Sequence, residues 1–129
     1  MSMYNPIPRT VFSLAASGMG TTLSGAGATS TPPIDVLDCT DLWLATSIKG
    51  TATGTTPTLL VQVDALDHQG NVFAQILKLT SITSAPATGS GYVGLHSSGV
   101  VLPRFVQITW TLGGTTPVYP QVEISLTGR

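Results

Sequence analysis

Three acidic residues at regular spacing are the first candidates for chemistry in this chain. Asp35, Asp38 and Asp41 recur at every third position. A calcium loop uses a denser set of oxygen ligands and a turn that glycine permits. Because residues 34–38 look extended and not helical, we expect solvated loop carboxylates and an Asx turn. A cation site that combines Asp38 and Asp41 with oxygens from another segment stays open.

Other motif-like patterns lack the surroundings that their chemistry needs. Residues 89–94 read GSGYVG, which fits the GxGxxG spacing, but no helical segment follows to hold a pyrophosphate. We predict a mobile hairpin loop there. His96 precedes two serines, yet a catalytic triad also needs an orienting acid and an oxyanion hole. Cys39 has acidic neighbours that disfavour a thiolate, so we expect a small buried side chain. Apart from the open question of a cation at Asp38 and Asp41, the sequence therefore predicts no enzyme, no metal site and no cofactor.

Aromatic residues are candidates for binding where the strand pattern turns them outward. Trp110 shares the apolar face of its segment, which predicts a core position. Trp43 lies on the opposite face from its leucine neighbours and could point to solvent, and Tyr92 is a further aromatic candidate. Tyr119 alternates with apolar residues and shares a polar face with Gln121. We predict Trp43 and Tyr119 as interface residues, for a protein partner or for a sugar.

The elements that must position these residues read as short strands separated by turns. Residues 105–112 and 118–126 alternate apolar and polar side chains with period two, so each strand buries one face, as in antiparallel sheets. Residues 72–79 could form a helix, but we favour a strand. We expect strands at 10–16, 21–24, 34–37, 42–48, 58–66, 72–79, 92–95, 100–112 and 118–126, with turns at 54–57 and 67–71. The predicted fold is all-β, an antiparallel β-sandwich of jelly-roll or Greek-key type with 8–9 short strands.

One tetrapeptide, GTTP, occurs twice. Residues 54–57 and 114–117 each precede an alternating strand. Glycine permits unusual φ angles and proline suits the entry to a strand. We interpret the repeat as the same turn chemistry used twice, in preference to an ancient duplication.

Composition limits the classes of partner. The chain has 129 residues, which argues for one domain, and only 9% of them are charged, with a net charge of −1. These values predict no binding to nucleic acid or to an anionic membrane surface. No apolar run approaches the length of a membrane helix, and we expect no signal peptide. The chain has 20 Thr, and such a sparsely charged, threonine-rich sandwich gives little protection against self-association.

The amino-terminal residues form a separate unit in this interpretation. Residues 1–9 are predicted to be an extended arm, and residues 10–129 a single β-sandwich domain. Pro6 and Pro8 fix their own φ angles and favour extended geometry in the residues before them. A restrained arm can lie along a neighbour at modest entropic cost. We predict that Tyr4, Pro6, Pro8 and Arg9 contact a partner, with a frayed terminus as the alternative.

The carboxy-terminal run LPRFVQITWTLGGTTPVYPQVEISLTGR resembles the end of small β-sandwich proteins of tailed-bacteriophage virions. Those proteins show an aromatic–Val–x–(Ile/Val)–x–Trp strand, then GGTTP and a last alternating strand, and GTTPTLLVQVDALDHQGNVF is similar to their middle part. The resemblance implies a non-enzymatic virion protein, of which a capsid decoration (cement) protein is the preferred type. It would assemble in the host cytoplasm on the outer surface of the capsid, bind the major capsid protein lattice and act as a homo-oligomer, a dimer or a trimer. A tail or head–tail connector protein and a carbohydrate- or receptor-binding module are the alternatives.

Overall fold

The computed structural model describes residues 8–14, 20–94 and 102–129, which contain nine strands and no helix. The strands are β1 (Arg9–Leu14), β2 (Thr21–Ser24), β3 (Gly27–Ser30), β4 (Ile34–Asp35), β5 (Asp41–Ile48), β6 (Thr53–Leu66), β7 (Val72–Lys78), β8 (Ala87–Gly94) and β9 (Phe105–Gly128). All their pairings are antiparallel. The predicted all-β antiparallel class is confirmed, and the segment that could have been a helix is strand β7.

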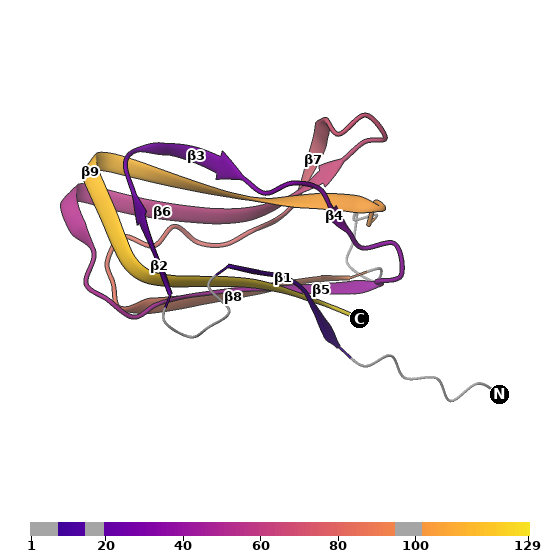
Figure 1. The fold of residues 1–129 in the computed structure, drawn as a ribbon, viewed down its shortest axis with the longest axis horizontal. Helices are drawn as coiled ribbons and strands as arrows, with labels where there is room; N and C mark the ends of the chain where they lie inside the picture. The colour runs from indigo at the N-terminus through magenta and orange to yellow at the C-terminus, as the bar shows by residue number, and fades with distance from the viewer. Residues whose placement is uncertain (1–7, 15–19, 95–101) are drawn as a thin grey trace.

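One hydrogen-bonded sheet makes both layers of the sandwich. Its central order is β7-β6-β9-β5-β8, and β1 to β4 also pair with β9. The first part of β9 pairs with β3, β4 and β6, whereas its last part pairs with β1 and β5. Figure 1 shows β9 crossing the molecule, bending sharply and returning in the other layer. The sheet thus folds over on itself and is nearly barrel-shaped.

The bend is made where the two GTTP repeats meet. Thr55 pairs with Thr115 across the β6–β9 ladder, so each repeat lies inside a continuous strand. The β6 register shifts on both sides of Thr55, as expected for bulged strands that turn a corner. The predicted turns between separate strands are therefore wrong at 54–57 and 114–117. We call residues 53–57 and 113–118 together the GTTP corner.

The two repeats have the same local geometry. Thr56 has φ 47° and Thr116 has φ 46°, and each Oγ1 donates a hydrogen bond of 2.8 Å to the carbonyl of the threonine before it. Gly114 has φ 96°, and a Cβ there would lie 2.5 Å from the Thr56 carbonyl oxygen. Glycine is required at this position by both conformation and space. The shared geometry supports the interpretation of one local chemistry used twice.

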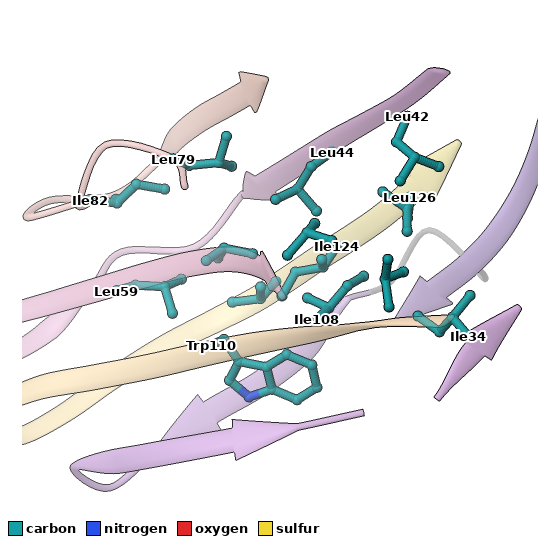
Figure 2. Packing of buried hydrophobic residues seen from close by; sticks show 14 of the residues in the cluster. Ile34, Leu42, Leu44, Leu59, Leu79, Ile82, Ile108, Trp110, Ile124 and Leu126 are labelled. Carbon is teal, nitrogen blue, oxygen red and sulfur yellow. The ribbon is translucent and has the colours of Figure 1, made fainter. Parts of the chain in front are cut away.

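The core fills the space between the two layers. Figure 2 shows leucine and isoleucine side chains of both layers pointing at one another, with Trp110 at one side. Trp110 is buried, as is Cys39, and both predictions are confirmed. The fully buried large side chains include Leu42, Leu44, Ile48, Leu59, Ile108, Ile124 and Leu126. Their alternation along β5, β6 and β9 is the period-two pattern read from the sequence.

Tyr119 lies in this core, so its predicted place on an exposed interface is wrong. It has no exposed surface, and its hydroxyl donates a 2.7 Å hydrogen bond to the Ile82 carbonyl. Gln121 has φ 56°, and the β2–β9 register slips between the pairs Thr21–Val122 and Leu23–Tyr119. An extra residue in a strand reverses the faces that follow it. The strict alternation assumed for the sequence therefore fails at Gln121.

The GSGYVG motif is not a hairpin loop. Residues 89–94 lie in β8, paired in unbroken register with β5. Glycines are accommodated there because Leu77 and Leu79 pack against the strand, and a Cβ on Gly91 would lie 2.9 Å from Leu79 Cδ2. Strand β3, which is not among the expected strands, pairs with the first part of β9. His96 lies outside the described residues.

Candidate interaction surface

Several strands begin or end at the end of the sandwich opposite the GTTP corner. Arg9 at the start of β1 pairs with Gly128 at the end of β9, and Asp41 at the start of β5 faces Gly94 at the end of β8. Figure 1 shows the C terminus, the connection after β4 and the β6–β7 hairpin at this end. We call it the termini end.

Exposed apolar side chains concentrate at the termini end. Among the described residues, four large hydrophobic side chains are exposed: Leu37 (66%), Phe73 (61%), Val72 (51%) and Tyr92 (47%). Leu37 lies in the β4–β5 connection, Val72 and Phe73 begin β7, and Tyr92 lies near the end of β8. Exposed apolar residues gathered at one end of a molecule are candidates for an interaction surface.

The three regularly spaced aspartates are also found here, and each has its own arginine. Asp35 Oδ2 lies 3.4 Å from Arg104, Asp41 Oδ2 lies 3.2 Å from Arg129, and Asp38 pairs with Arg9. Asp35 Oδ1 also accepts the Leu37 N–H at 2.9 Å, which confirms the predicted Asx turn. The expectation of solvated loop carboxylates is wrong for Asp41, which is buried at the start of β5. The described residues contain no group of three or more His, Cys, Asp or Glu placed to hold a metal ion.

These ion pairs tie distant parts of the chain together. Arg9 lies at the start of β1, Arg104 directly precedes β9 and Arg129 directly follows it. The guanidinium of Arg9 beside Asp38 holds the pKa of that carboxyl below its ordinary value. Because the pair is exposed, its contribution to stability is small and sensitive to salt. Its main consequence is to tie the start of β1 to the connection between β4 and β5.

Two aromatic rings form a ledge on the outer face of the same end. The ring centroids of Trp43 and Tyr92 are 5.0 Å apart at 44°, and the Arg129 guanidinium lies 5.2 Å from the Trp43 ring centroid. The Tyr92 hydroxyl donates a 2.7 Å hydrogen bond to Asp41, which raises the pKa of the phenol. Trp43 is half-buried and faces away from Leu42 and Leu44, as the strand pattern predicted.

Beside this ledge the outer face is hollowed by small side chains. Successive outward residues of β5 and β8 are Ala45, Ser47, Thr88 and Ser90. They line a shallow groove of about 510 Å³ whose far side is formed by Glu123 and Ser125 of β9. The lining contains a single ionisable residue, Glu123, whose carboxylate lies 3.5 Å from Lys49.

The β6–β7 hairpin presents Val72 and Phe73 on a well-ordered turn. Asp67 Oδ1 accepts the backbone N–H groups of Gln69 and Asn71, both at 2.9 Å. These bonds lower the pKa of Asp67, the one from Asn71 most strongly. The predicted turn at 67–71 is therefore confirmed. The exposure of Val72 and Phe73 was not predicted. The signal for it is that two adjacent apolar residues directly after a turn cannot both face the core of an alternating strand.

The structure describes only the last two residues of the predicted arm, residues 1–9. Pro8 is exposed and Arg9 already belongs to β1, whereas Tyr4 and Pro6 lie outside the described residues. No helix in the described parts of the chain is long and apolar enough to cross a membrane.

Comparison with known proteins adds no relative to this picture. No protein-family model matches the chain, and no curated protein matches it either.

Proposed function

We propose that this chain is a non-enzymatic structural protein of a tailed-phage virion, a decoration protein that binds the assembled major capsid lattice through its termini end. The observation that carries the proposal is the concentration of exposed apolar side chains at that end, among arginines already paired with aspartates. The sequence resemblance supports the virion class. A tail or head–tail connector protein would use the same surface on a different lattice.

The charge arrangement suits permanent contact with another protein. Arg9, Arg104 and Arg129 each have an aspartate partner within this chain. A partner that covers them therefore does not leave an unpaired buried charge, which would be costly. The contact would rest on apolar burial and hydrogen bonds and would depend only mildly on salt.

The aromatic residues and arginines at the termini end are of types found in measured interfaces. Binding hot spots are enriched in aromatic residues and arginine, and sit in well-packed clusters. At the termini end Arg104 lies 5.0 Å from the Phe105 ring, and Arg129 covers Trp43. These stacked arginines are held in place before a partner arrives, so little side-chain entropy is lost on binding.

Stabilisation of the capsid would follow from mass action. A protein that binds the assembled lattice and not the free subunit stabilises the lattice by its binding free energy. On the outer surface of a capsid, many copies would each add a modest interface.

Cosedimentation tests this proposal. The protein is mixed with assembled capsids and, separately, with unassembled major capsid protein of the same phage. We expect binding to capsids only, and a loss of affinity of about 30-fold for Phe73→Ser, a change of about 2 kcal/mol. Thr115→Ala, in the exposed part of the GTTP corner, is the matched control and should bind like wild type. Equal affinity for assembled and unassembled protein would refute the mechanism.

A second candidate function is favoured by the aromatic ledge. Trp43 and Tyr92 lie beside the polar Asp41 and a shallow groove, an arrangement compatible with a sugar ring. A carbohydrate-binding module would lose glycan binding in Trp43→Ala while its fold stays intact. A glycan array on which wild type gives no signal excludes this second candidate and leaves the first untouched.

A further inference from the structure

Strand β8 differs from every other edge strand of the described sheet. It pairs only with β5, through eight consecutive residue pairs without a shift. The edges at β1, β2 and β7 are interrupted by register shifts, and β3 and β4 have four and two residues. Short length and bulges are the usual protections against edge-to-edge pairing. β8 has neither, and its sequence ATGSGYVG contains no charge and no proline.

Among the described residues, a groove lies beside the first half of this edge. The sheet does not close between β7 and β8; instead, side chains such as Leu77 and Leu79 pack against the inner face of β8. A shallow groove of about 380 Å³ runs between residues 79–84 and residues 87–90. Apart from Leu79, Ile82 and Ala87, its lining is small and polar. An added strand could therefore pair with the free edge of β8 and extend the β5–β8 layer.

We propose that the partner of β8 is the β8 strand of a second copy of this chain, joined in an antiparallel two-fold pair centred on Ser90. The strand is nearly symmetric about this residue, with Gly89 and Gly91 on either side and Thr88 and Tyr92 beyond them. A two-fold axis at Ser90 places Gly89 opposite Gly91 and each Tyr92 opposite a Thr88. Aromatic and β-branched residues in directly opposed positions stabilise antiparallel pairs.

The charge of the strand favours a second copy over an unrelated strand. Two-fold pairing brings identical residues together, so any charge in β8 would meet its own kind, and β8 has none. Asp41, which faces Gly94 at the end of β8, is paired with Arg129 within one copy. The dimer would form one continuous layer in which the two Trp43–Tyr92 ledges lie on the same face. This inference does not depend on the capsid-binding proposal.

Cysteine cross-linking tests the register. Directly opposed residues of an antiparallel pair have Cα atoms about 4.5 to 5.5 Å apart, within the range of a disulfide. Ser90→Cys should give a disulfide-linked dimer under mild oxidation. Ala45→Cys is the matched control, because Ala45 faces Ser90 across the β5–β8 ladder on the same outer face. Its two copies would lie about 14 Å apart, three strand spacings, and should not cross-link.

Mass measurement in solution tests the interface without a covalent bond. At about 100 µM, wild type should have twice the 13.3 kDa mass of one chain. Ser90→Lys places two like charges opposite each other and should weaken the dimer about 100-fold, whereas Ala45→Lys should leave it unchanged. Circular dichroism and thermal melting confirm that both variants fold. A monomeric wild type, or Ser90→Cys that stays monomeric under oxidation, overturns the proposal. A dimer lost in Tyr4→Ser and kept in Ser90→Lys overturns it as well, because the amino-terminal residues would then be the partner.

Discussion

The two ends of the sandwich are determined by different features of the chain. At the GTTP corner, backbone conformation decides: paired threonines and glycines with positive φ bend two adjacent strands together. At the termini end, side-chain contacts determine the structure. Three aspartates each pair with one arginine, and the rings of Trp43 and Tyr92 contact each other, all across large sequence separations. The first arrangement fixes the fold, and the second presents a surface.

The difference has a consequence for substitutions. A change at the corner or in the core beside it should alter stability and leave the exposed surface as it is. A change at the termini end should alter binding, because the exposed side chains there bury little apolar area within this chain. The largest effects on folding are therefore expected near the bend.

Tyr119→Ala should have the largest effect on stability. The side chain is fully buried just beyond the corner, and its removal should lower the free energy of unfolding by about 3 to 5 kcal/mol. Tyr119→Phe, which loses only the hydrogen bond to the Ile82 carbonyl, should cost about 1 kcal/mol. Urea denaturation measures both. A loss below about 1 kcal/mol for Tyr119→Ala would contradict its place in the core.

Gly114→Ala comes next and separates strain from collision. Its φ of 96° disfavours any side chain, and the new Cβ would also lie 2.5 Å from the Thr56 carbonyl oxygen. Gly70, in the β6–β7 turn, has φ 84° with no atom within 4 Å of such a Cβ. We expect a loss of about 1 kcal/mol for Gly70→Ala and about 3 kcal/mol for Gly114→Ala, measured by thermal denaturation. Equal losses would mean that the corner accommodates a side chain.

The same contrast explains how far the sequence could predict the fold. Period-two alternation correctly indicated both halves of β9, because a strand between core and solvent must alternate. β5 and β7 were also predicted as strands, but β7 itself does not alternate, since Val72 and Phe73 are both exposed. It failed at positions with positive φ: GTTP looked like a turn between strands, and Gln121 reversed the faces around Tyr119. Whether such residues end a strand or bend it depends on the strand opposite. That partner is not visible in a local pattern.

The surface was predictable only where it is local. The Asx turn at Asp35 and the outward direction of Trp43 follow from near neighbours in the chain. The partners of the aspartates do not, since Asp41 and Arg129 are 88 residues apart. Only the end of strand β8 was predicted, at 92–95; its first part was missed because its glycines fit against Leu77 and Leu79, which is a tertiary contact. The predicted arm residues Tyr4 and Pro6 stay predictions.

The smallest expected effect distinguishes the two ends through their tyrosines. The pKa of Tyr119 is raised by burial, whereas the pKa of Tyr92 is raised mainly because Asp41 accepts its hydrogen bond. Each phenol therefore stabilises the fold below the unfolded-state value near 10.0, and this contribution is lost as the pH rises above it. Asp41→Asn should lower the pKa of Tyr92 toward 10.0 and leave that of Tyr119 unchanged, as followed by ¹³C NMR of the ring carbons. If both values fell together, Asp41 would be supporting the whole sandwich, and the separation between a fold-determining corner and a surface-forming end would not hold.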